Sequence, residues 1–188
     1  MAKRLNLADA FFLNAESRDA YMHVAMLHRY RIPESAGDDW VADQVEHMRQ
    51  FPVDQQPFNL RLKPGLVGKV APAWEVDSNI DIDYHLRHAA LPKPGGEREL
   101  GILVSRLHSQ PLDKNRPLWE CTIIEGLNDG TFALYFTIHP ALRDGMSGSR
   151  TMSRCLSPNP DERGMPAFWA MPPLPRGASG IPKALIES

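Results

Sequence analysis

Phe136-Thr-Ile-His139-Pro140-Ala-Leu-Arg-Asp144-Gly145-Met-Ser-Gly148 is the stretch of this sequence that decides the fold. The run 132–138 is rich in aromatic and β-branched residues, which predicts a strand. Gly145 supplies the backbone freedom that a turn after this strand needs. A histidine at such a strand end, here His139, can serve as a general base. On this stretch alone a simpler alternative stays open, namely a strand and an ordinary turn with His139 partly exposed.

The chain around this stretch mixes strands with helices, which predicts an α+β, or mixed α/β, fold class. The turn signal Asn128-Asp129-Gly130 predicts an antiparallel hairpin that presents His139 at its far end. Periodicity predicts strands over 22–31, 80–86, 119–125 and 132–139, and helices over 9–16, 38–51, 97–108 and 147–155.

The composition of the chain limits the classes of protein to which it can belong. The 188 residues are 43% hydrophobic with a formal net charge of -2, and they suit a single domain with its own core. The chain contains no apolar run near the roughly 18 residues of a membrane span, no secretory signal and no basic cluster for nucleic acid, so we expect a cytoplasmic protein. Cys121 and Cys155 are interpreted as small apolar residues, and the histidines show no metal-ligand spacing, so no metal is expected.

A second block, Pro111-Leu-Asp-Lys-Asn-Arg-Pro-Leu-Trp119-Glu120, is long enough to be specific. Together with the opening stretch it resembles the bacterial wax ester synthase/diacylglycerol acyltransferase family of CoA-dependent acyltransferases. That family has the motifs His-His-x-x-x-Asp-Gly and Pro-Leu-Asp-x-x-Arg-Pro-Leu-Trp. Residues 7–24 and 80–88 also resemble family segments in the same order, so the resemblance covers roughly residues 4–170.

The resemblance implies one half of a chloramphenicol acetyltransferase-like, two-domain CoA-dependent acyltransferase fold. Residues 1–170 then correspond to the N-terminal acyltransferase domain. Residues 171–188 are expected to be a Pro/Gly-rich linker or tail. The C-terminal domain of the family is expected to be absent from this chain.

The resemblance also implies a set of site residues. His139, Asp144 and Gly145 occupy motif positions, but Pro140 stands where the family's second histidine deprotonates the acceptor alcohol. Proline has neither an imidazole nor a backbone N–H, so we expect lost or impaired base catalysis. Asp144 is expected to shape the turn by pairing with an arginine.

The family places the segment Pro117-Leu118-Trp119 near the substrate channel, which makes these three residues candidates for substrate binding. A tryptophan at the start of a strand is more often a core anchor, and for Trp119 we favour that interpretation.

The implied activity is transfer of a fatty acyl group from acyl-CoA, as co-substrate, to a long-chain alcohol or diacylglycerol, with no bound cofactor. A C-terminal acyltransferase half is the implied partner, and the apolar substrates imply peripheral association with membranes or lipid droplets. Two alternatives remain open. The domain could bind acyl-CoA or lipid without catalysis, or it could be a degenerate fragment that folds but has no role.

Overall fold

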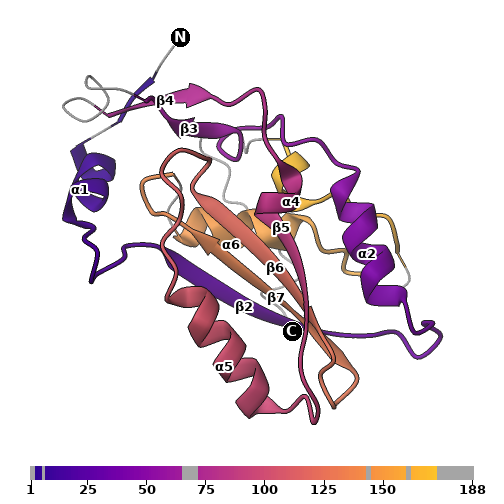
Figure 1. The fold of residues 1–188 in the computed structure, drawn as a ribbon. Coiled ribbons are helices and arrows are strands. Elements are labelled where there is room, and N and C mark those ends of the chain that lie inside the picture. Colours follow the sequence, from indigo (N-terminus) through magenta and orange to yellow (C-terminus); the bar gives the residue numbers. More distant parts are fainter. Residues whose placement is uncertain (1–2, 6, 65–71, 143–144, 160–161, 173–188) are drawn as a thin grey trace.

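The computed structural model describes residues 3–5, 7–64, 72–142, 145–159 and 162–172 (Figure 1). Its centre is a four-stranded sheet in the order β2-β7-β6-β5. Strand β7 pairs antiparallel with both of its neighbours, whereas β5 and β6 run parallel. The strands are β2 (Val24–Arg31), β5 (Leu86–Ala90), β6 (Trp119–Glu125) and β7 (Thr131–Ile138).

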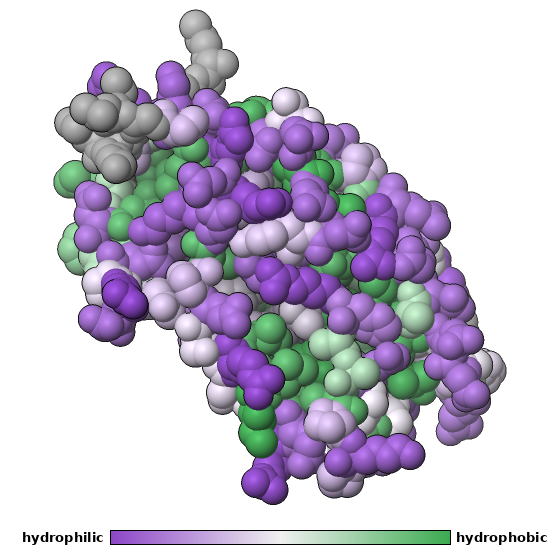
Figure 2. Space-filling view, in the orientation of Figure 1, coloured by the Kyte–Doolittle hydropathy of each residue, from purple (hydrophilic) through white to green (hydrophobic). Residues whose placement is uncertain are grey.

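A smaller antiparallel sheet lies at one end of the central sheet, close to α1 (Leu7–Ala15) (Figure 1). Its strands, in the order β1-β4-β3, are β1 (Lys3–Arg4), β4 (Ala73–Val76) and β3 (Leu60–Leu62). Figure 2 shows apolar residues at the molecular surface over α1, where Leu7 and Phe11 are exposed.

The two faces of the central sheet carry different partners, because side chains alternate along each strand. From β7, Leu134 and Phe136 join the larger core, while Ala133 and Tyr135 join a smaller one. The smaller core is covered by α5 (Glu97–His108). The larger core is covered by α2 (Trp40–Arg49), α6 (Gly145–Arg154) and the 3-10 helix η1 (Phe168–Ala170).

The predicted hairpin is confirmed. Strands β6 and β7 pair antiparallel with Trp119 opposite Ile138, and Gly130 closes the turn with a φ of 73°. This positive φ suits glycine, which has no Cβ to clash in the left-handed region. The predicted ranges 119–125 and 97–108 match the structure, and five others shift by at most two residues at either end.

The predicted strand over 80–86 is wrong. The structure has a single helical turn, α4 (Ile82–His85), followed by β5 from Leu86. The Asp81 side chain accepts a hydrogen bond from the backbone N–H of Asp83 at 3.2 Å, as helix-capping aspartates do. A local cap therefore overrides the alternating pattern that suggested a strand.

The core interpretation of Trp119 is confirmed, since its side chain is 0% exposed. Its indole N–H donates a hydrogen bond of 2.8 Å to the carbonyl of Phe58, which satisfies the one polar atom of the ring. The ring also stacks on Trp169 and on His85, with centroid distances of 5.6 and 4.5 Å. Trp119 thus joins the start of β6 to segments far away in the sequence.

The described residues include no helix that is both long enough and apolar enough to cross a membrane.

Replacing Trp119 should destabilise the domain more than replacing a tryptophan at the edge of the core. We expect Trp119→Ala to lower the free energy of unfolding by about 3–5 kcal/mol, because it leaves a large cavity and an unpaired Phe58 carbonyl. Trp40→Ala, at a half-buried position, is the matched control and should cost less. Urea unfolding curves measure both values, and equal losses would contradict the anchoring role of Trp119.

Candidate active site

The motif residues form a tight turn at the end of β7. The carbonyl of His139 accepts a hydrogen bond from the N–H of Leu142 at 2.9 Å, so Pro140 is the second residue of a β-turn. This position favours proline, because its fixed φ fits the turn and its missing N–H is not needed. The turn therefore forms without the imidazole that the family carries at position 140.

His139 is buried, with 1% of its surface exposed. Its Nδ1 accepts a hydrogen bond of 3.1 Å from the backbone N–H of Ala141, which assigns the proton of the neutral ring to Nε2. Burial lowers the pKa of His139 to about 4. The negative charge of Glu16 raises this pKa, whereas the positive charges of Lys114 and His23 lower it further. The one lone pair of the neutral imidazole is thus already used by the turn.

The last residue of the motif begins the next helix. Gly145 is the first residue of α6, so the structure confirms a strand, a turn and a helix in that order. Asp144 lies outside the described residues, and its expected role in shaping the turn stays a prediction. Among the residues that the structure describes, no group of three or more metal-binding side chains comes together.

An ion pair links two segments that the sequence had already singled out. Lys114 Nζ lies 2.6 Å from Glu16 Oε2, and the carboxylate side chain is only 6% exposed. Burial opposes ionisation of Glu16, but the hydrogen bond and the charge of Lys114 outweigh it and lower the pKa of Glu16. Neither residue was predicted for the site. Their only sequence signal was membership in the family-like segments.

The candidate substrate residues Pro117, Leu118 and Trp119 lie directly beneath the turn. The backbone N–H of His139 donates a hydrogen bond of 3.0 Å to the carbonyl of Leu118. Leu118 and Trp119 are buried in the larger core, and this block therefore supports the motif. Contact of these three residues with substrate stays a prediction.

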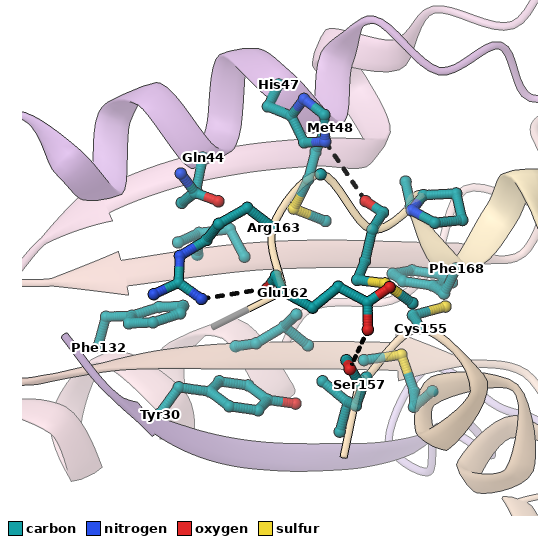
Figure 3. Close-up of a pocket in the computed structure, with 18 of the residues that line it drawn as sticks. Tyr30, Gln44, His47, Met48, Phe132, Cys155, Ser157, Glu162, Arg163 and Phe168 are labelled. Atoms are coloured by element: carbon teal, nitrogen blue, oxygen red, sulfur yellow. Dashed lines mark hydrogen bonds between the residues drawn. The ribbon is translucent and has the colours of Figure 1, made fainter. Parts of the chain in front are cut away.

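A cavity of about 370 Å³ opens on the face of the sheet that carries the larger core (Figure 3). It is bounded by α2, by β2 and β7, by the end of α6 and by the segment that leads to η1. Apolar side chains form much of its wall, among them Tyr30, Met48, Phe132, Met152 and Phe168. Polar groups lie among them, with Ser157 bonded to Glu162, and His47 Nε2 lies 3.3 Å from the carbonyl of Met165 (Figure 3).

The cavity lies away from the motif along β7. Phe132 lines the cavity, and Ile138 directly precedes His139 of the motif. The six-residue step from Phe132 to Ile138 separates the cavity from the motif by about 20 Å, because a strand rises about 3.3 Å per residue. Helix α6 connects them, because it starts at Gly145 and carries Met152 at the cavity wall. Sequence reasoning did not find this cavity, since its walls come from segments scattered along the chain.

The motif, the block beneath it and the fold agree with what comparison with known proteins shows. Residues 5–185 match the family model described as wax ester synthase/diacylglycerol acyltransferase catalytic domain, and the chain belongs to that family. It is 44% identical over 170 residues to a probable diacylglycerol O-acyltransferase of Mycobacterium tuberculosis, covering 89% of this chain and 37% of that protein. It is 41% identical to the O-acyltransferase WSD of Acinetobacter baylyi, covering 89% of this chain and 35% of the relative.

Solved structures confirm the expected fold. The wax ester synthase/diacylglycerol acyltransferase from Marinobacter aquaeolei VT8 matches with a TM-score of 0.82 and 44% identity, over 90% of this chain and 42% of that one. The starter condensation domain of a rhizomide synthetase, solved in complex with C8-CoA, shares the fold alone, with a TM-score of 0.58 and 10% identity. The chain thus spans well under half the length of the relatives it matches.

The buried histidines should make the domain less stable in acid. Burial lowers the pKa of His139 to about 4 in the folded state, from 6.5. The unfolded chain therefore binds more protons between these two values, and the free energy of unfolding falls as pH drops through this window. His139→Asn removes this titration, while its side-chain oxygen can still accept the Ala141 N–H.

We expect the urea midpoint of the native chain to fall more steeply between pH 6.5 and 4 than that of His139→Asn. The other titrating groups are common to both proteins, so the difference isolates His139. Parallel curves would show that the ring is not held neutral in the folded state.

Proposed function

We propose that this chain is the N-terminal part of an acyl-CoA-dependent O-acyltransferase, which transfers a fatty acyl group to a long-chain alcohol or to diacylglycerol. The observation that carries the proposal is the motif in its structural context. His139 directly follows β7 and begins a tight turn, and α6 begins at Gly145. The names of the relatives in Mycobacterium tuberculosis and Acinetobacter baylyi support an O-acyl transfer.

Two observations support acyl-CoA as the donor. The starter condensation domain that shares this fold was solved with C8-CoA. The cavity between α2 and α6 has the size and the largely apolar wall that suit an aliphatic chain. The proposed transfer needs no bound cofactor, because the thioester is already an activated acyl group.

Pro140 defines what the proposed reaction lacks. The acceptor hydroxyl must lose its proton as its oxygen attacks the thioester carbonyl, and general-base assistance is worth about 10²–10⁴-fold in rate. Position 140 cannot provide it, because proline has no proton-accepting side chain. The proposed enzyme is therefore slower than relatives with histidine at this position.

The remaining part of the relatives is the proposed partner. The chain covers 37% of the Mycobacterium tuberculosis protein, so a second segment of the family can contribute to a complete site. Exposed apolar side chains at α1 and on the edge strand β2, including Phe11 and Leu27, suit such a contact. Because both acceptors are poorly soluble in water, the proposal places the transfer at the surface of a membrane or lipid droplet in the cytoplasm.

Restoring the missing imidazole should raise activity. We expect Pro140→His to increase the rate of thiol release from palmitoyl-CoA about 10²-fold with hexadecanol or diacylglycerol as acceptor. Pro140→Ala is the matched control, because it removes the same turn proline without adding a base. Both variants should lose about 0.4–1 kcal/mol of stability, since proline restricts the unfolded chain.

The assay is run on the chain alone and together with the remaining segment of a full-length relative. Equal rates for the native chain and Pro140→His, with the second segment present, would show that position 140 does not limit the reaction. Saturable acyl-CoA binding with no turnover by either protein would overturn the transferase proposal in favour of a binding domain.

Filling the cavity should weaken the binding of an aliphatic chain. Met48 lies in the cavity wall on α2, and Met48→Trp narrows the space there (Figure 3). We expect the dissociation constant of a fluorescent C16 fatty acyl probe to rise about 10-fold, as for one misfitting group in an apolar pocket. The control is Ile102→Trp, at an exposed position of α5 that does not line the cavity. Unchanged binding by Met48→Trp would exclude this cavity as the chain site.

A further inference from the structure

His23 lies next to the motif and has an unusual hydrogen-bonding state. It is 6% exposed, and its Nε2 lies 3.0 Å from the backbone carbonyl of His108. A carbonyl only accepts, so Nε2 carries the proton and the lone pair of the neutral ring is on Nδ1. Tyr21 stacks on the His23 ring, and the ring of His108, bonded through Nδ1 to the Tyr135 hydroxyl, packs against its edge. The ring is therefore held in one orientation.

Two buried ring atoms near the motif lack a hydrogen-bond partner among the described residues. One is Nδ1 of His23, which is an acceptor, and the other is Nε2 of His139, which is a donor. Leaving either one unpaired away from water costs free energy. A bound group, or a buried water, that accepts from one atom and donates to the other would remove this cost.

The strand register places these two residues side by side. Val24 of β2 pairs with Ile138 of β7, so His23 and His139 are the next residues along the two antiparallel strands. The His23 side chain turns toward the end of α5, where it meets His108. The charge of His23 also contributes to the lowered pKa of His139, as expected for neighbouring rings. Two charged side chains also affect the pKa of His139. Glu16 directly follows α1, and Lys114 lies in the 111–120 block and pairs with it.

The chemistry of the pair suits one class of ligand. A hydroxyl group accepts one hydrogen bond through its oxygen and donates one through its proton, so a single hydroxyl satisfies both rings. A thioester or a carboxylate has no proton to donate to Nδ1. Burial of both rings also keeps bulk water away, which a thioester acyl transfer needs if it is to avoid hydrolysis.

We propose that His23 and His139 together hold the hydroxyl of the acceptor, with His139 Nε2–H donating to its oxygen and His23 Nδ1 accepting its proton. This inference rests on the proposed function and names the acceptor site of the same reaction. As the alcohol oxygen bonds to the acyl carbon, its proton moves to His23 Nδ1. The C–S bond then breaks, and the leaving CoA sulfur takes the proton from the His23 imidazolium. His23 is thus the proton acceptor in this proposal, and the gain expected from Pro140→His measures how much an imidazole at position 140 adds to it.

Two substitutions remove the proposed groups and keep the structural hydrogen bonds. In His23→Gln, the side-chain N–H can still donate to the His108 carbonyl, but the amide oxygen is not a base that could take up the proton in place of Nδ1. In His139→Asn, the side-chain oxygen can still accept the Ala141 N–H, but the donor at Nε2 is lost. His88→Gln is the matched control, because His88 lies on β5 and contacts Glu125.

The first readout is binding, and it does not require turnover. Nitrogen NMR of the histidine-labelled chain should show both rings in the Nε2–H form. Adding 1-octanol should shift His23 Nδ1 and His139 Nε2 together, whereas octane should shift neither. Both variants should lose the coupled response, and His88→Gln should keep it. If octanol moves neither atom, the pair holds only a structural water and the proposal is wrong.

The second readout is thiol release from palmitoyl-CoA with hexadecanol. We expect His23→Gln to reduce the rate by about 10²-fold or more, as for loss of a general base, and His88→Gln to stay within about two-fold of the native chain. Full turnover by His23→Gln would overturn the role of His23. A coupled NMR response without turnover in the native chain, with the remaining segment of a full-length relative present, would uphold the hydroxyl site and overturn the transferase proposal, so the two failures are distinguishable.

Discussion

The pairing of β7 between β2 and β6 is the constraint on which the rest of the structure depends. Ile138 lies opposite Val24 on one side and opposite Trp119 on the other. This register brings three distant segments to one end of the sheet, where His139 leaves the strand. A slip of one residue would turn every side chain of β7 to the other face and would separate His139 from its neighbours.

The same alternation divides the chemistry of the domain between two faces. The face under α5 carries a series of hydrogen-bonded residues, from Tyr135 through His108 to His23, and His23 lies beside His139. The opposite face is apolar, with the Trp119 core and the cavity next to Phe132. The proposed acyl transfer would use both properties, since an aliphatic chain needs an apolar wall and a reacting hydroxyl needs polar partners.

Pro140 shows that structure and catalysis can be separated at a single position. The turn keeps its hydrogen bond from Leu142 to His139, because proline suits the second place of a β-turn. Retention of the fold therefore says little about retention of the base. The tautomer of His139, set by Ala141, explains why this neighbouring histidine does not replace the missing imidazole.

The sequence by itself determined the hairpin, most of the helices, the family and the absence of a base at position 140. These features depend on local patterns or on residues in fixed order along the chain. Only the tertiary structure decided that His23 lies beside His139, that Glu16 meets Lys114, and that 80–86 contains a helical turn. The reason is physical, because register, burial and the tautomer of a ring depend on contacts between segments that are distant in sequence or on hydrogen bonds that no periodicity records.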